Sequence, residues 1–200
     1  MPSTLWPYVT PGIPDHLFER SPGIPITQRE LRLMILAQLQ LRAESRLWDI
    51  GAGTGTIAVE SALLCPAGRV VAFERDPDVV ALIETNCQRF ELDNVEVIEG
   101  NAPDCLRDRS DQPTRICVES SRAIGSILDA AWDHLSDDGR IVATANNLEA
   151  LYTISEGFAR LQVRQVDIVQ AAINRLERRS THQALAAIDP LFIVSGTKLD

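Results

Sequence analysis

The chain has 200 residues, of which 45% are hydrophobic and 24% are charged, and its formal net charge is −9. This length and composition fit one globular domain with a substantial core. The acidic balance argues against broad nucleic-acid binding, which depends on neutralising phosphates, although it leaves room for a local basic pocket. We therefore expect no nucleic-acid partner.

The four cysteines form no CxxC pair and have no histidine at ligand spacing. We expect neither a metal site nor a redox pair, but reduced thiols packed in a reducing compartment. The N-terminus lacks the basic and apolar regions of a signal peptide, and no apolar run reaches the ~20 residues that a membrane span needs. The sequence thus predicts a cytoplasmic protein without a membrane partner.

Residues 1–26 are rich in Pro and Gly and predict an irregular lead-in that drapes over the domain. A helix is expected to follow it. The letters "TQRE" match a capping box, with Thr27 as the N-cap and Glu30 returning to it. Apolar side chains then recur at helical spacing between Leu31 and Leu39.

From Arg46 onward, apolar runs alternate with helical patterns. The runs expected to be strands are 47–50, 70–73, 95–98, 116–118, 141–145, 163–169 and 191–195, and the helices expected between the early ones are 57–64, 77–90 and 124–135. Such alternation implies parallel strands with helices on both faces. After a polar connection, the last run could return antiparallel. We expect a single α/β domain over residues 1–200, with a seven-stranded, mostly parallel, Rossmann-like sheet and an antiparallel last strand.

The stretch "LWDIGAGTGTIAVE" places Gly51, Gly53 and Gly55 where the first of these strands meets a helix. Glycines permit a positive φ and let a ligand approach the backbone closely. The free N–H groups at the start of a helix favour an anionic group. This stretch therefore predicts a nucleotide-type binding loop.

Three ligands compete for the loop. A nucleoside triphosphate needs GxxxxGK[ST], and no Lys follows Gly55. A dinucleotide prefers GxGxxG, and here the third glycine comes one place early. S-adenosylmethionine fits better, because Asp49 just before the loop suits its positive sulfonium. Its methionine carboxylate can lie near the helix N-terminus.

The next two strands support this cofactor. Glu74 ends the second strand roughly 20 residues after the last glycine, where an acid accepts hydrogen bonds from ribose hydroxyls. After the third strand, Asn101 can accept from the exocyclic amine of adenine, and Ala102 leaves room for the ring. A helix-capping Glu and a plain turn are the structural alternatives. Together, the loop, Glu74 and "GNAP" resemble the class I methyltransferase pattern, which also assigns Ala52 and Thr54 to the cofactor.

Two classes of methyl acceptor can be excluded because their enzymes carry motifs that this sequence lacks. Amino-methylating enzymes resemble one another in a [DN]PP[YF] motif after the fourth strand, whereas "ESSR", Glu119 to Arg122, stands here. Cytosine C5 enzymes need a nucleophilic cysteine in a Pro-Cys loop, but Cys105 follows Asp104.

The N-terminal half then gives a positive indication. "GIPDHLFERSPGIPITQRELRLMILAQLQL" followed by the glycine loop resembles the decarboxylating cobalt-precorrin-6B C15-methyltransferases of cobalamin biosynthesis. "ERDPDVVALIETNCQRFELDNVEVIEGNAP", "DGRIVATANNLEALY" and "DPLFIVSGTK" also fit that family's pattern. The resemblance covers nearly the whole chain, and its most specific part is Gly-Ile-Pro-Asp with Pro-x-Thr.

The resemblance implies an enzyme that methylates carbon 15 of a corrinoid tetrapyrrole and removes the carboxyl of its C12 acetate. It also implies a cytoplasmic homotetramer in which Thr27 touches the cofactor. It leaves open whether the ring already holds cobalt and whether a separate chain methylates carbon 5. Where the family has a Gly-Gly pair and a Gly-rich turn after the fourth strand, this chain has "ESSRAIGS", and Asn101 replaces the usual acid.

The acceptor carries many carboxylates, so some arginines must compensate for the protein's negative charge. Arg122 is our candidate for binding the substrate. Arg175, Arg178 and Arg179 in "NRLERRSTH" are a weaker set, since they could form a solvated helix face, and His16 and His182 could also donate to a carboxylate. No catalytic acid or base is assigned.

Two alternatives remain at this point. One is an RNA or protein methyltransferase of the same fold. The other is a catalytically lapsed protein that still binds S-adenosylmethionine, which the altered "ESSR" loop would permit.

Overall fold

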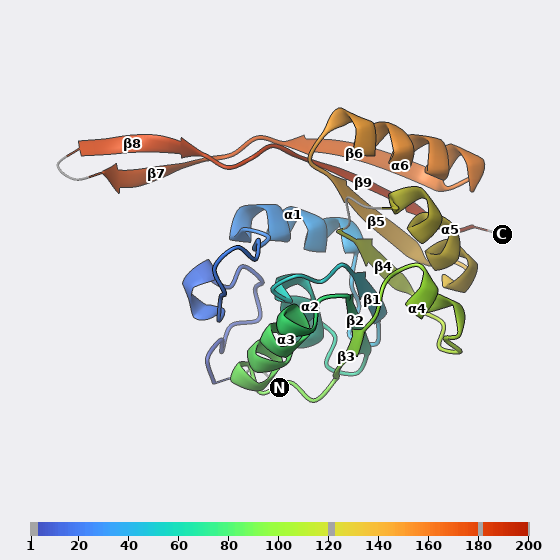
Figure 1. Cartoon of the computed structure of the whole chain (residues 1–200), viewed down its shortest axis with the longest axis horizontal. Helices are drawn as coiled ribbons and strands as arrows, with labels where there is room; N and C mark the ends of the chain where they lie inside the picture. Colours follow the sequence, from blue (N-terminus) through green and yellow to red (C-terminus); the bar gives the residue numbers. More distant parts are fainter. Residues whose placement is uncertain (1–3, 120–122, 180–181, 200) are drawn as a thin grey trace.

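The computed structural model describes residues 4–119, 123–179 and 182–199. Seven strands form one sheet in the order β3-β2-β1-β4-β5-β9-β6 (Figure 1). The strands are β1 (Arg46–Ile50), β2 (Arg69–Glu74), β3 (Val95–Glu99), β4 (Arg115–Val118), β5 (Arg140–Ala145), β6 (Arg164–Ala171) and β9 (Leu191–Thr197). This confirms all seven expected strands, to within about two residues at each end.

The strand directions follow the expected pattern. The pairs β1–β2, β1–β4, β2–β3 and β4–β5 are parallel. Strand β9 enters between β5 and β6 and runs antiparallel to both. The prediction of a mostly parallel sheet with an antiparallel last strand is therefore confirmed, and the carboxyl ends of β1 to β5 meet at one edge.

Helices cover both faces of the sheet. They are α1 (Arg29–Leu39), α2 (Thr56–Leu64), α3 (Pro77–Arg89), α4 (Asp104–Arg107), α5 (Ile124–His134) and α6 (Leu148–Arg160), with a 3-10 turn η1 (Asp15–Leu17) in the lead-in. Alternate residues of the buried strands point to opposite faces. Leu47 and Val70 join the core under α1, α2 and α3, whereas Trp48 and Val71 join the core under α5 and α6. None of the described helices has the length and apolar character required to cross a membrane.

Helix α6 was not expected from the sequence. Asn147 caps it, because its side chain accepts a hydrogen bond from the backbone N–H of Ala150 at 2.8 Å. Its apolar stripe of Ala150, Ile154 and Phe158 is buried against the sheet. Both signals are present in the sequence, but the predicted elements include no helix between residues 145 and 163.

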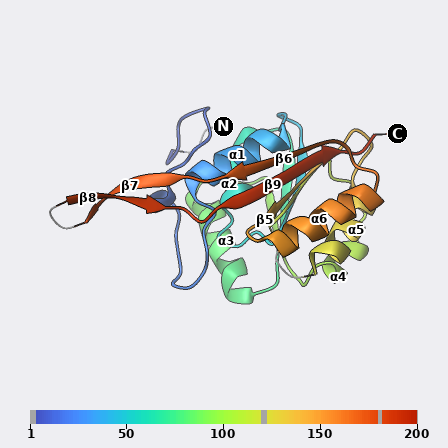
Figure 2. The ribbon, with the colours of Figure 1, turned by 90° about the horizontal axis from the view of Figure 1, so that it is seen from above.

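The polar connection before the last strand is a two-stranded arm, β7 (Asn174–Arg179) and β8 (His182–Ala187). It projects away from the helices and the main sheet (Figure 2). The helical interpretation of its arginines is therefore wrong. Arg175 forms salt bridges with Asp15 at 2.9 Å and with Glu30, whose pKa it lowers to about 2. The arm is thus anchored to the lead-in and α1 at its base.

The predicted capping box is also wrong. The N-cap of α1 is Gln28, which makes no side-chain cap, and Glu30 binds Arg175 instead of turning back. The Thr27 hydroxyl donates to a Glu119 carboxylate oxygen at 2.9 Å. A partner 92 residues away has therefore displaced the local one.

Candidate active site

The glycine loop has the conformation that its sequence predicts. Gly51, Gly53 and Gly55 have φ values of 80°, 54° and 79°, which residues with a Cβ rarely adopt. Space is a second restriction at Gly55, where a Cβ would come within 2.9 Å of Ile83. Gly55 is the N-cap of α2. The loop therefore turns tightly from β1 into the helix.

Glu74, at the end of β2, lies against this loop. One of its carboxylate oxygens accepts from the backbone N–H of Gly53 at 3.2 Å. The other accepts from the N–H groups of Arg75 at 2.8 Å and Asp76 at 3.2 Å. These bonds fix the carboxylate beside the glycines and leave acceptor capacity free on the oxygen that faces Gly53.

A cavity of about 660 Å³ opens at the carboxyl ends of β1, β2 and β3. Five residues expected to bind a cofactor line it: Gly51, Gly53, Glu74, Asn101 and Ala102. Open parallel sheets place ligands at this edge, and the volume lies in the range of small-molecule sites.

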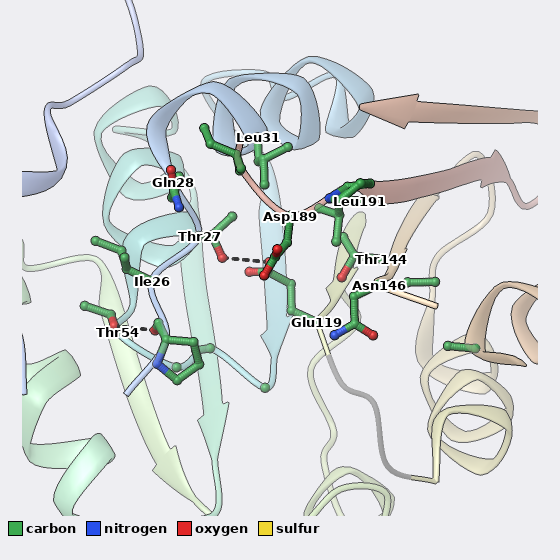
Figure 3. A pocket seen from close by; sticks show the side chains of 18 residues that line it. Ile26, Thr27, Gln28, Leu31, Thr54, Glu119, Thr144, Asn146, Asp189 and Leu191 are labelled. Carbon is green, nitrogen blue, oxygen red and sulfur yellow. Dashed lines mark hydrogen bonds between the residues drawn. The ribbon is translucent and has the colours of Figure 1, made fainter. Parts of the chain in front are cut away.

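A second cavity of about 360 Å³ adjoins the first (Figure 3). Its polar residues are Thr27, Gln28, Thr54, Glu119, Thr144, Asn146 and Asp189. The two cavities share four wall residues, namely Pro25, Gly51, Gly53 and Glu119. A ligand in one cavity can therefore meet a ligand in the other at this wall.

The other predicted cofactor residues are distributed around the loop. Ala52, Thr27 and Thr54 line the second cavity, and the Thr54 hydroxyl donates to the carbonyl of Pro25 at 2.8 Å. Asp49 and Gly55 line neither cavity. Asp49 lies on β1 before the loop and Gly55 ends the loop, so any effect they have on a ligand acts through the loop or through the electrostatic field.

Asp49 is a buried carboxyl group with no hydrogen-bond partner on either oxygen. The backbone N–H of Ala58 lies near enough to lower its pKa somewhat, without reaching hydrogen-bonding geometry. Burial raises the pKa of Asp49 well above its usual range, and the carboxylates of Glu119 and Glu74 raise it further. A positive charge placed near Asp49 would therefore favour the ionised form of this carboxyl group.

Glu119 is the nearby second acid. One carboxylate oxygen of Asp49, one of Glu119 and the Sγ of Cys117 all lie within 4.8 Å of one another. Burial raises the pKa of Glu119 to about 7, and this rise is opposed by the hydrogen bond from Thr27 and by the charge of Arg32. Burial also keeps Cys117 a thiol, because its pKa is raised well above the usual value.

These features test the fit of the expected cofactor. S-adenosylmethionine requires a pocket for a nucleoside, an acceptor for ribose hydroxyls and a negative environment for its sulfonium. The larger cavity, the fixed Glu74 carboxylate and the acid pair of Asp49 and Glu119 meet these needs. The residues present therefore fit the group.

The weaker substrate candidates that the structure describes do not line either cavity. Arg122 lies outside the described residues. Arg175 binds Asp15 and Glu30, and Arg178 and His182 are exposed on the arm. His16 is exposed in the 3-10 turn of the lead-in.

Sequence reasoning missed Glu119, Thr144, Asn146 and Asp189 as cavity residues. Glu119 directly follows β4, and Asn146 directly follows β5. The rule that ligands bind beyond the carboxyl ends of parallel strands could have found both. Asp189 comes from the segment between β8 and β9, which was not recognised as part of the site.

Comparison with known proteins gives consistent matches along the chain. The family model described as "Precorrin methyltransferase domain" matches residues 17–194. A relative from Saccharolobus solfataricus, named probable cobalt-precorrin-6B C(15)-methyltransferase (decarboxylating), is 34% identical over 196 residues, covering 96% of this chain and 98% of its own. The Salmonella typhimurium protein of the same name, without "probable", is 30% identical and covers 92% of this chain and 95% of its own.

A solved structure agrees with these relatives. The crystal structure of precorrin-6Y C5,15-methyltransferase from Geobacter metallireducens superposes with a TM-score of 0.87 at 28% identity, covering 96% of this chain and 98% of the other. The family-model match includes six strands of the main sheet in full, the first part of β9, and the residues around both cavities. The chain therefore belongs to the precorrin methyltransferase family.

Proposed function

We propose that this protein is an S-adenosylmethionine-dependent C-methyltransferase of cobalamin biosynthesis. Its substrate is a cobalt-precorrin-6B-type tetrapyrrole, which it methylates at carbon 15 while the C12 acetate loses its carboxyl as carbon dioxide. The observation that carries this proposal is the pair of adjoining cavities with a common wall at Gly51, Gly53 and Glu119. The names of the relatives identify the acceptor class.

In this proposal the cofactor occupies the larger cavity, and when bound it supplies an electrophilic methyl group on a positive sulfur. The Glu74 carboxylate accepts hydrogen bonds from the ribose hydroxyls, and Asn101 and Ala102 border the adenine. The remaining residues of the proposed cofactor site are Thr27, Asp49, Gly51, Ala52, Gly53, Thr54 and Gly55. Gly51 and Gly53 line the larger cavity, Thr27, Ala52 and Thr54 line the adjoining one, and Asp49 and Gly55 act through the loop or its electrostatic field.

The second cavity receives the reacting edge of the tetrapyrrole. Methyl transfer requires the attacking carbon about 3 Å from the methyl group and in line with it, and orientation can supply several kcal/mol of the barrier. Thr144 and Asn146 at the end of β5 and Asp189 before β9 present polar groups that can orient this edge. The electron-rich ring carbon can attack directly, so no covalent enzyme intermediate is needed.

Mass spectrometry tests this function. Purified protein incubated with S-adenosylmethionine and cobalt-precorrin-6B should yield a product that has gained one methyl group and lost one carbon dioxide, together with S-adenosylhomocysteine. Binding of both ligands without turnover would instead indicate a lapsed enzyme. Absence of S-adenosylmethionine binding would contradict the proposed function altogether. Parallel reactions with the metal-free ring would decide whether cobalt is required.

We further propose that Arg122 binds a carboxylate arm of the tetrapyrrole, because a guanidinium pairs bidentately with carboxylate. Replacing Arg122 with Ala should raise the tetrapyrrole dissociation constant by at least about tenfold, because hydrogen bonds to a charged group are worth about 1.5–3 kcal/mol. Fluorescence titration with the tetrapyrrole measures this, and calorimetry with S-adenosylmethionine is the control and should be unaffected. Equal tetrapyrrole affinity in both proteins would remove Arg122 from the site.

We also propose that the protein acts in the cytoplasm as a homotetramer and as a single methyltransferase domain. The projecting arm supports self-association, because Leu176 and Leu185 face each other across β7 and β8 and are 62% and 69% exposed. Exposed apolar pairs on a projecting hairpin are typical of contact surfaces. Light scattering on the purified protein should give the mass of four chains. A monomer mass would contradict this assembly.

A further inference from the structure

Glu119 occupies the position where the two cavities meet. Of the four wall residues that the cavities share, only Glu119 has an ionisable side chain. A methyl donor in one cavity and its acceptor in the other must approach within about 3 Å of each other at this wall. The charged sulfur of the donor must therefore lie near Glu119.

Among the described residues, the charged groups around Glu119 are mostly acids. Asp49 on β1, Glu74 on β2 and Asp189 before β9 are acids in or beneath the same cavities, and Cys117 on β4 is a neutral thiol. Arg32 on α1 is the cation that acts on Glu119, but its guanidinium is already bound to Glu60, Asp15 and two backbone carbonyls. Arg75 also lines the larger cavity, next to Asp76, so among the described residues the acids around the pair outnumber the cations.

Two carboxyl groups this close cannot both ionise cheaply in a buried environment. Asp49 lacks hydrogen-bond partners, whereas Glu119 keeps one from Thr27. We propose that Asp49 and Glu119 share one proton in the ligand-free protein and release it when the positive sulfonium of S-adenosylmethionine binds. This pair thereby distinguishes the cofactor from S-adenosylhomocysteine, whose sulfur is neutral. The inference rests on the proposed function, because it assumes that this cofactor binds here.

The sign of the pH dependence follows from this arrangement. The cation binds best when both acids are ionised, so affinity for S-adenosylmethionine should fall as pH falls through the raised pKa values of the pair, of which that of Glu119 is about 7. Well below these values the decrease should approach tenfold per pH unit, the limit for one linked proton. Affinity for S-adenosylhomocysteine should stay nearly constant, because it adds no charge beside the pair.

Calorimetry of the wild-type protein tests this directly. Each ligand is titrated at pH 6.0–6.5 in two buffers of different ionisation enthalpy, where the α-amino group of both ligands stays protonated. S-adenosylmethionine should release about 0.5–1 proton, as linkage requires for a group with this pKa, and S-adenosylhomocysteine should release almost none. Equal proton release by the two ligands would overturn the proposal.

Two variants locate the effect. Glu119→Gln keeps the size and an acceptor for Thr27 but removes the charge that helps to raise the pKa of Asp49, so proton release should decrease and the preference for S-adenosylmethionine should drop by about tenfold at pH 8. Thr27→Val removes the hydrogen bond that lowers the pKa of Glu119, so proton release should shift to higher pH. Glu44→Gln, an exposed acid between α1 and β1, is the matched control and should behave as wild type.

The outcomes separate this inference from the proposed function. Proton release of the same size and at the same pH in Glu119→Gln and in the wild type would remove Glu119 from the pair. Tight binding of both ligands without proton release would overturn the shared proton but leave the cofactor assignment intact. Failure of the wild-type protein to bind either ligand would overturn the proposed function itself.

Discussion

Replacing Glu74 with Gln should weaken S-adenosylmethionine binding by about 10- to 100-fold, the loss expected when one hydrogen bond to a charged group, about 1.5–3 kcal/mol, is removed. Both oxygens of Glu74 are in use, one accepting from Gly53 and the other from Arg75 and Asp76. A glutamine has only one acceptor oxygen, so its NH₂ group must face backbone N–H donors on one side. The loop and the ribose acceptor should both be disturbed.

Calorimetric titration with S-adenosylmethionine measures this effect. Glu99→Gln is the matched control, since Glu99 pairs with Glu74 in the register of β2 and β3 but is exposed and lines neither cavity. The control should change affinity by less than about twofold, as surface substitutions usually do. A Glu74→Gln protein that binds the cofactor as tightly as wild type would place the ribose elsewhere.

The sequence predicted the sheet well because its signals are local. Strands β1, β2, β4 and β5 are buried on both faces, so they are read as continuous apolar runs. The glycine loop was equally predictable, because a positive φ at Gly51, Gly53 and Gly55 restricts the residue type at each position. Glu74 was correctly placed beside that loop because its position depends only on two neighbouring strands.

Predictions failed where distant residues compete with local ones. Thr27 and Glu30 fit a capping box, but Glu119 takes the hydroxyl and Arg175 takes the carboxylate. Neither partner lies within 90 residues in the chain, so no local pattern could reveal it. The arm was missed for a related reason. "NRLERR" has a single apolar residue, Leu176, which is exposed, so the stretch shows no alternation of apolar and polar residues.

The acid pair shows what a linear reading leaves out of a site. Asp49 and Glu119 are 70 residues apart, and their coupling depends on the pairing of β1 with β4. The sequence identified Asp49 because it precedes the glycines, but it offered no reason to connect it with the residue after β4. Only the strand order β1-β4 makes them neighbours and turns two separate acids into a group that can respond to a cation.

Arg32 is expected to have the largest effect on stability. Its side chain is fully buried, and its Nε donates to Glu60 at 2.5 Å. Its other nitrogens donate to the carbonyls of Thr27 and Ile13 and to Asp15. Glu60 in turn accepts from the N–H groups of Gly12 and Ile13. This network joins the lead-in, α1 and α2.

Replacing Arg32 with Met should therefore lower the free energy of unfolding by about 3–5 kcal/mol, because it leaves Glu60 as a buried charge without its partner. For a chain of this size the melting temperature should fall by roughly 6–20 °C. Thermal unfolding followed by circular dichroism measures the melting temperature and the free energy of unfolding. The double variant Arg32→Met/Glu60→Gln should recover part of the loss, since it removes the unpaired charge.

Arg69→Met is the matched control for this measurement. Arg69 pairs with Glu96 at 2.6 Å, but its side chain is 62% exposed, so its loss should cost less than about 1 kcal/mol. Arg32→Met should also weaken S-adenosylmethionine binding, because Arg32 holds the carbonyl of Thr27, whose hydroxyl donates to Glu119. If Arg32→Met melted at the same temperature as Arg69→Met, the lead-in would be held by its apolar contacts rather than by the buried ion pair.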